Sequence, residues 1–177
     1  MKRKWLIAFL VAVLGAGLYV GHVLATAASG QTTTTYAKSL FDPVKLRGFQ
    51  LLPETGTQKN RSHEPKFWSA RIRTHNASDL YVVDNKFAPG GTTGWHSHPG
   101  PSLIFVVSGT ITNYLADDPT CTGHPYSAGS GFTDPGGDSI HMLRNEGSVP
   151  AETIAVQFLP TGADRKIDEP DPGNCHF

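Results

Sequence analysis

Two stretches decide the fold of this chain: residues 90–98, which read GGTTGWHSH, and residues 129–145, which read GSGFTDPGGDSIHMLRN. The first stretch holds two histidines, His96 and His98, two positions apart. On a β-strand such residues project from the same face, because side chains alternate with a period of two. The second stretch holds His141, which on a later strand can complete a three-nitrogen cap on one metal ion. The sequence therefore predicts a three-histidine site on neighbouring strands.

The first stretch resembles the first of the two motifs of the cupin superfamily, in spacing as well as in composition. That motif consists of a glycine, five residues, His-x-His, three or four residues, a glutamate, six residues and a second glycine. Gly90, His96, His98 and Gly109 occupy the corresponding positions. The glutamate is missing, because Ser102 stands in its place. The chain is thus similar to a three-histidine variant of the family.

The second stretch resembles the second cupin motif, which consists of glycine, five residues, Pro-x-Gly, two residues, histidine, three residues and asparagine. Gly129, Pro135, Gly137, His141 and Asn145 fit this pattern, with one extra residue between Gly137 and His141. A β-bulge can absorb one residue and restore the direction of the histidine. The resemblance to the family extends over about residues 66–160.

The resemblance implies an all-β fold, the double-stranded β-helix or jelly-roll barrel of cupins, with a divalent transition metal in its mouth. Its ligands would be His96, His98 and His141, and imidazole suits Fe, Zn, Ni and Cu, with Mn usually requiring more oxygen ligands. Two functions remain open. One is a metal-dependent, dioxygenase-like enzyme acting on a small molecule, and the other is a non-catalytic cupin that binds a small ligand or a metal.

Three polar residues near the motifs are candidates for a supporting role. Ser102 shares the parity of the two histidines before it, so we expect it to face the site and to hydrogen-bond there. Asp134 and Asp138 flank the second motif and can supply the missing carboxylate or a general base. Capping of the turn at residues 135–137 is the alternative for both aspartates, and the turn composition favours it.

The pattern between residues 66 and 160 agrees with an all-β barrel. Short alternating apolar segments are separated by Gly- and Pro-rich turns, and helical periodicity is absent from this part of the sequence. Residues 63–160 are the expected cupin domain. The alternate apolar residues Leu103, Phe105 and Val107 can form a homodimer face.

The N-terminus has the form of a targeting or anchoring segment. Residues 2–4 read KRK, and residues 5–24 contain no Asp, Glu, Lys or Arg. Twenty apolar residues are long enough to span a bilayer as a hydrophobic helix, and a basic flank stays on the cytoplasmic side. Residues 25–27, ATA, have the small-x-small form of a signal-peptidase site. We therefore expect residues 1–27 to be a signal peptide or a membrane anchor, with the barrel outside the cytoplasm.

The segments on either side of the barrel are polar. Residues 28–62 are expected to be a linker or spacer, because QTTTT at 31–35 shows no periodicity, although 40–41 and 46–52 are apolar enough for a short element. Residues 161–177 are expected to be a surface tail. The two cysteines, Cys121 and Cys175, fit an oxidising compartment, so a disulfide is expected, with two free thiols or a metal-bound thiol as the alternatives.

The charge balance excludes one class of partner. The chain has 15 basic and 15 acidic residues, and three of the basic ones lie at the extreme N-terminus. The remaining chain is mildly acidic and offers no basic surface of the kind that nucleic acid requires. A small-molecule ligand or substrate is the expected partner, together with a membrane if the N-terminal segment is not cleaved.

Overall fold

The computed structural model describes residues 24–51 and 67–177. This part of the chain is all-β, with strands in two sheets. The strands are β1 (Ser29–Phe41), β2 (Lys45–Leu51), β3 (Phe67–Arg73), β4 (Ser78–Thr92), β5 (His96–His98), β6 (Ser102–Ser108), β7 (Thr110–Leu115), β8 (His124–Ser127), β9 (Gly131–Asp134), β10 (Gly137–Arg144), β11 (Ala151–Pro160) and β12 (Ile167–Asp168).

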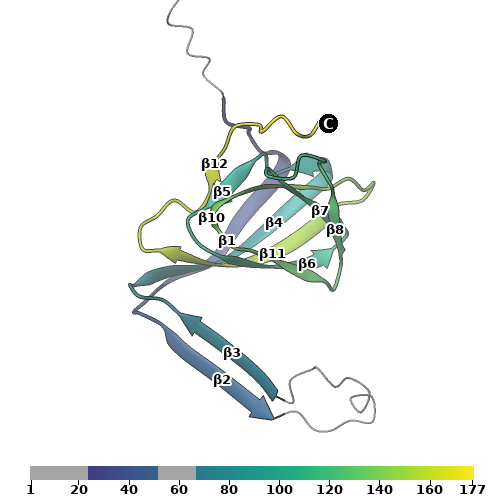
Figure 1. The fold of residues 1–177 in the computed structure, drawn as a ribbon. Helices are drawn as coiled ribbons and strands as arrows, with labels where there is room; N and C mark the ends of the chain where they lie inside the picture. Colours follow the sequence, from purple (N-terminus) through teal and green to yellow (C-terminus); the bar gives the residue numbers. More distant parts are fainter. Residues whose placement is uncertain (1–23, 52–66) are drawn as a thin grey trace, which may run out of the picture.

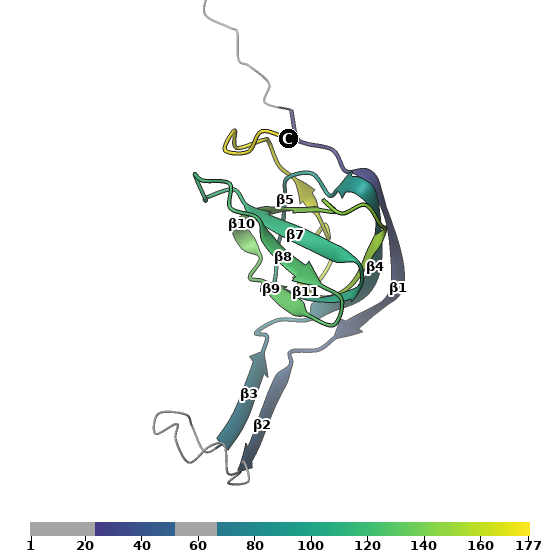
Figure 2. The ribbon, with the colours of Figure 1, turned by 90° about the vertical axis from the view of Figure 1, so that its right-hand side faces the viewer.

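Ten of these strands form one antiparallel sheet that curls into a nearly closed barrel (Figures 1 and 2). Its main path runs β12-β5-β10-β4-β11-β6-β9, while β1 pairs with β4, and β7 pairs with β10 and β8. Neighbours in space are therefore far apart in sequence, as in a jelly roll. The expected all-β barrel is confirmed.

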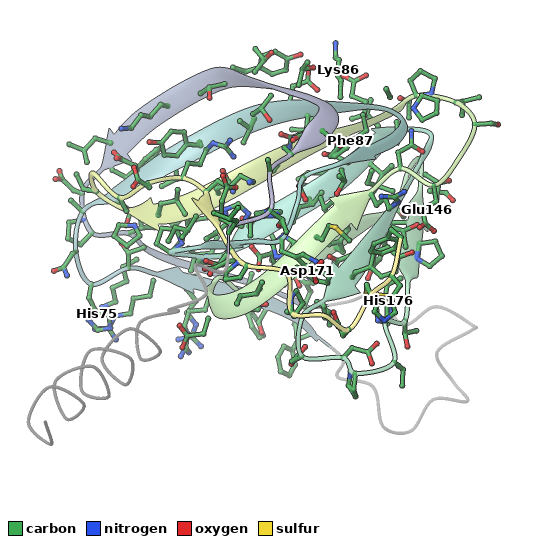
Figure 3. All side chains as sticks on the ribbon, turned by 90° about the horizontal axis from the view of Figure 1, so that it is seen from above. His75, Lys86, Phe87, Glu146, Asp171 and His176 are labelled. Atoms are coloured by element: carbon green, nitrogen blue, oxygen red, sulfur yellow. A yellow bond between two sulfur atoms is a disulfide. The ribbon has the colours of Figure 1, made fainter. Side chains whose placement is uncertain are left out.

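Alternation along the strands produces the core. In β6 and β11 every second residue is buried, and the inward positions include Ile104, Val106 and Ala155. Figure 3 shows two neighbouring residues of β4 on opposite sides, with Lys86 pointing away from the sheet and the fully buried Phe87 lying against it. Burial of these apolar side chains supplies the main favourable free energy of folding.

The predicted spacer is a strand over much of its length. Residues 29–41 form β1, which pairs with β4 from Ser29 opposite Thr92 to Phe41 opposite Ser78. Threonine is β-branched and prefers extended backbone, so an exposed polar tract can still form a strand at the edge of a sheet. Residues 29–41 of the expected spacer are therefore a strand of the barrel sheet, because backbone pairing does not require apolar periodicity.

Strands β2 and β3 form a separate two-stranded hairpin, which projects away from the barrel (Figures 1 and 2). Residues 46–51 of the apolar stretch noted in the sequence are thus in a strand, and this strand pairs with β3 and not with a strand of the barrel. We call this hairpin, residues 45–51 and 67–73, the arm.

The C-terminal segment, residues 161–177, folds back over one end of the barrel. Its strand β12 pairs with the histidine strand β5, with Ile167 opposite Ser97 and Asp168 opposite His96. Cys175 is bonded to Cys121, with Cα atoms 5.3 Å apart, and packs with Trp95, Tyr114 and Met142. The predicted disulfide is present, and the predicted tail is an ordered cover.

The expected N-terminal hydrophobic helix lies in residues 1–23, outside the described residues. In the described ranges, the structure contains no helix that is long and apolar enough to cross a membrane.

Candidate metal centre

Strands β5 and β10 bring the three predicted histidines together. His96 and His98 lie on the same face of β5, and His141 lies opposite His96 on β10. The ring centroids are 4.3 Å apart for His96 and His141, 4.8 Å for His96 and His98, and 5.5 Å for His98 and His141. All three side chains are buried. The other described histidines lie elsewhere; His75 and His176, for example, are on opposite sides of the molecule (Figure 3).

The extra residue before His141 is accommodated as a local irregularity of the ladder. Gly137 pairs with His98 and His141 pairs with His96, so four positions on β10 span two positions on β5. Gly137 also has a positive φ of 65°, a backbone conformation that favours glycine. This bulge restores the direction of His141 toward the other two rings.

Backbone carbonyls set the tautomers of two of the histidines. The Nδ1 of His96 is 2.9 Å from the carbonyl oxygen of Gly94, and the Nδ1 of His98 is 2.6 Å from the carbonyl oxygen of Arg165. A carbonyl oxygen only accepts, so each Nδ1 donates and each Nε2 carries the free lone pair. This is the usual way in which a protein orients imidazole toward a metal.

Burial keeps the three rings neutral. Loss of solvent lowers the pKa of His96 well below its ordinary value, and neighbouring His141 and His98 lower it further. Burial is also the main cause that lowers the pKa of His98 and that of His141, the latter to about 4. All three imidazoles are therefore unprotonated at pH 7, which is the form that binds metals.

The spacing of the ligand atoms fits one ion after a small contraction. One ring nitrogen from each histidine can be chosen so that all three lie within 4.8 Å of one another. Two nitrogens that bind one ion at about 2.1 Å are about 3.4 Å apart in a tetrahedral site. Side-chain movements of about 1.4 Å close the largest gap, so the donor set can hold a transition metal.

Asp134 faces the same three histidines from β9. Its side chain is buried, with Oδ2 3.8 Å from the Nε2 of His98 and Oδ1 3.8 Å from the Nδ1 of His141. Oδ1 accepts a hydrogen bond from the backbone N–H of Gly136, whereas Oδ2 and the Nδ1 of His141 are buried without a partner. Asp134 thus caps the turn with one oxygen and presents the other to the site. Asp138 is exposed and does not join it.

The register explains how a carboxylate reaches this position. Asp134 pairs directly with Ser102, the residue that stands where the cupin motif has glutamate. Both side chains are buried, and they project to the same side of two adjacent strands. The Asp134 carboxylate, on the neighbouring strand, therefore lies next to the position that the glutamate has in the cupin motif.

Two further residues of the site were not predicted from the sequence. Gln157, on β11, is buried, and its Nε2 donates to the Oγ of Ser102 over 3.2 Å. Its Oε1 accepts a hydrogen bond from the Nη1 of Arg165 over 3.2 Å. The signal for Gln157 was a polar residue on the inward parity of an apolar strand. Arg165 gave no such signal, because it belongs to the polar C-terminal segment.

The histidines line a cavity of about 40 Å³. Ser102, Thr153, Gln157, Arg165 and Lys166 are also in its wall. A water molecule needs roughly 10–15 Å³ of such volume, so the cavity has room for an ion and a molecule of a few heavy atoms.

Residues 85–157 match the family model described as Cupin domain. This range contains both histidine motifs, Asp134 and Gln157. Residues 85–157 are therefore a cupin domain, of a form that has three histidines and lacks the motif glutamate.

Several solved structures are similar to this one. An oxalate oxidase shares 22% identity with a TM-score of 0.43, over 50% of this chain and 45% of that chain. A protein with a double-stranded β-helix domain from Klebsiella pneumoniae shares 22% identity with a TM-score of 0.43, over 51% and 75%. The polyketide cyclase RemF from Streptomyces resistomycificus shares 18% identity with a TM-score of 0.43, over 52% and 64%. The chain thus spans less than half of the oxalate oxidase. No curated protein matches the sequence.

Proposed function

We propose that this protein is an extracytoplasmic cupin that binds one divalent transition-metal ion through His96, His98 and His141. The observation that carries this proposal is the convergence of three buried, neutral imidazoles whose ring nitrogens lie within 4.8 Å of one another. The three rings line one cavity and can share one partner, and the buried Nδ1 of His141 has no hydrogen-bond partner among the described residues.

Asp134 completes the donor set in this proposal. Its unpartnered Oδ2 is 3.8 Å from the Nε2 of His98, which is within the roughly 4.2 Å that two atoms on one ion can span. One carboxylate lowers the net charge of the bound ion and adds an oxygen to three nitrogens. Iron, zinc, manganese, nickel and copper all accept such a set, so the ion has to be identified by experiment.

The protein residues define what the site can do. The hydrogen bonds from His96 to Gly94 and from His98 to Arg165 fix the rings, so the ligand geometry is set before the ion arrives. Ser102 and Gln157 line one wall and can bind polar groups of a small molecule. When bound, a transition metal would supply Lewis-acid or redox chemistry to a ligand that enters the cavity.

Elemental analysis of the protein, purified without a histidine tag, tests this proposal. We expect close to one equivalent of a transition metal per chain, removable with a chelator and restored by titration. A protein that purifies without metal and binds none of Fe, Zn, Mn, Ni or Cu in titration would contradict it.

Two functions of a metal-loaded barrel remain to be separated: an oxygenase-type enzyme and a binding protein. The neutral histidine set and the small cavity suit both. Oxygen uptake by iron-loaded protein, measured with a panel of small thiols and diketones, distinguishes them. Turnover that is lost in His96→Ala favours the enzyme, and tight metal binding without turnover on any substrate favours the binder.

The extracytoplasmic location rests on the basic residues 2–4, the uncharged residues 5–24 and the disulfide. A reporter that is active only outside the cytoplasm, fused after residue 60, is expected to be active. Strong activity of a reporter that works only in the cytoplasm would exclude this location. The mass of the mature protein then shows whether cleavage occurs near residue 27.

A further inference from the structure

The cavity contains a cation that no described residue neutralises. Arg165 is half-buried in the cavity wall, and no carboxylate of residues 24–51 or 67–177 lies within ion-pair distance of it. The neighbouring cation, Lys166, also lines the cavity but pairs with Asp168. Burial lowers the pKa of the Arg165 guanidinium, which nevertheless stays charged at pH 7.

Arg165 is held in place by the same contacts that build the metal centre. Its carbonyl oxygen accepts the hydrogen bond from the Nδ1 of His98, and its Nη1 donates to the Oε1 of Gln157. The guanidinium is therefore fixed relative to the histidines. Its remaining N–H groups form a planar donor fork of the kind that binds carboxylate or phosphate oxygens.

A hydroxyl group adds to this polar wall. Thr153 lines the cavity, and its buried Oγ1 has no hydrogen-bond partner among the described residues. A buried cation and a buried unsatisfied hydroxyl both cost free energy unless a ligand satisfies them. The volume of about 40 Å³ limits that ligand to a few heavy atoms.

We propose that the cavity binds a small anion, specifically a short-chain carboxylate, between Arg165 and the metal centre. This inference rests on the proposed metal site and names the class of its ligand. A divalent ion with one carboxylate ligand keeps one net positive charge, and Arg165 adds a second one in the cavity wall. A monocarboxylate offsets one of these two charges, and a dicarboxylate offsets both.

Calorimetric titration of the zinc-loaded protein with formate, acetate and oxalate tests the proposal, with acetamide as the neutral analogue. A charged hydrogen bond contributes about 1.5–3 kcal/mol, so Arg165→Gln is expected to weaken carboxylate binding about 10- to 100-fold. The carboxylate affinity of Arg165→Lys is expected to lie between the affinities of wild type and Arg165→Gln. The matched control is Arg144→Gln, because Arg144 faces Glu146 outside the cavity.

The outcomes separate this inference from the metal site itself. Unchanged zinc content with equal carboxylate affinity in wild type and Arg165→Gln would overturn the carboxylate proposal and leave the metal proposal standing. Equal binding of acetamide and acetate would overturn it as well. A wild-type protein that takes up no zinc would instead contradict the metal proposal.

A separate observation concerns the arm, whose composition does not suit an isolated hairpin. Its apolar side chains are widely exposed; they include Leu46 at 59%, Phe49 at 60%, Leu51 at 70% and Trp68 at 53%. A two-stranded hairpin alone in water is marginally stable. The arm therefore needs a surface that covers these side chains.

The charges of the arm add a second requirement. Lys45 pairs with Arg73 across the ladder, and Arg47 pairs with Arg71. Like charges directly opposite each other destabilise a sheet. These four are the charged residues of the two strands, all of them basic, whereas the described residues outside the arm carry five basic and thirteen acidic residues. The arm and the barrel are thus complementary in charge.

The barrel has an unpartnered apolar row that the arm can cover. Leu103, Phe105 and Val107 point outward from β6 and are 43%, 49% and 50% exposed. In Figures 1 and 2 the arm extends away from its own barrel, so it does not cover this row itself. The purple segment that precedes β1 lies at the end of the barrel opposite the arm (Figure 1).

We infer that the arm docks on the β6 face of a second copy of this chain, in a reciprocal dimer. Each copy supplies one basic, apolar arm and one acidic barrel. A two-fold symmetric arrangement uses both pairs of surfaces at once.

Light scattering coupled to size exclusion tests the dimer with the intact chain. Wild type is expected to be dimeric. The dissociation constant of the dimer is expected to rise at least 10-fold in the double variant Arg47→Glu with Arg71→Glu. It should rise by a similar factor in the single variant Phe105→Asp. Mixing the arm variant with the barrel variant restores one intact arm–barrel contact per pair and should recover part of the dimer. The exposed Leu24→Ala is the control.

A monomeric wild type at tens of micromolar would overturn the dimer. Binding of that monomer to vesicles rich in phosphatidylglycerol, lost in Arg47→Glu with Arg71→Glu, would assign the arm to an anionic membrane instead. Unchanged dimerisation in all variants would place the interface elsewhere.

Discussion

The motif strands β5 and β10 and the C-terminal segment contribute to the same site in different ways. The motif strands supply the three imidazoles, whose type and spacing are those of metal ligands. The C-terminal segment supplies a carbonyl that fixes the tautomer of His98 and a guanidinium in the cavity wall. The comparison teaches that ligand identity and ligand environment come from separate parts of the chain. Metal affinity should therefore depend mainly on the strands, and selection of the small molecule mainly on the segment.

The largest effect is expected from removal of a histidine. A structural metal site contributes about 10–16 kcal/mol over four ligands, so His96→Ala, His98→Ala or His141→Ala should each weaken metal binding by about 100- to 1,000-fold. His124→Ala is the matched control, because His124 lies exposed on β8. Competition titration against a chromophoric chelator measures the change. Full stoichiometric affinity in any of the three variants would remove that residue from the ligand set.

The second-largest effect is expected from removal of the disulfide, which frees the C-terminal segment from the barrel. The Cys121–Cys175 bridge closes a loop with a sequence separation of 54. On the chain-entropy model, Cys121→Ser with Cys175→Ser should lower the free energy of unfolding by about 4 kcal/mol. Urea denaturation measures this loss. Metal stoichiometry below the unfolding midpoint should persist, because the histidines lie on β5 and β10; loss of metal from the folded double variant would contradict the division of roles.

A smaller effect is expected at Asp134. Asp134→Asn removes the negative charge but keeps an acceptor for the N–H of Gly136, so the turn is preserved. Loss of a ligand or a close partner of one typically costs 10- to 100-fold in metal affinity, and we expect a decrease in that range. Asp138→Asn is the control, because Asp138 is exposed. If the two variants bind metal equally well, Asp134 serves the turn alone.

The last expected effect is a pH dependence of the stability of the metal-free protein. The pKa of each buried histidine is lowered in the folded state, that of His141 to about 4, whereas the unfolded value is about 6.5. Between these values the unfolded chain binds more protons, so the stabilising contribution is fully present above about pH 6.5 and is lost as the pH falls toward 4.

Urea denaturation of chelator-treated protein at pH 7, 6 and 5 checks this slope. His141→Ala should have a flatter profile than wild type over the same range, because one of the three titrating rings is gone. A wild-type stability that stays constant between pH 7 and 5 would show that the rings are not buried as neutral groups.

The sequence by itself determined the three candidate ligands and the type of barrel. His96 and His98 share a face because of strand periodicity, and the glycines and proline around the histidines restrict where turns can form. The two cysteines were sufficient to predict their bridge. These features are local or follow from composition, so they can be derived without knowledge of the fold.

Only the tertiary structure decided what surrounds the ligands. Asp134 lies near the histidines because it pairs with Ser102 on the neighbouring strand. Gln157 faces the site because it occupies an inward position of β11. Arg165 lies there because β12, which follows it, pairs with β5. The same holds for β1, whose threonines form a strand through pairing with β4. The physical reason is that strand pairing joins residues distant in sequence. The sequence around a polar residue does not show which residue of a distant strand it will contact in the folded protein.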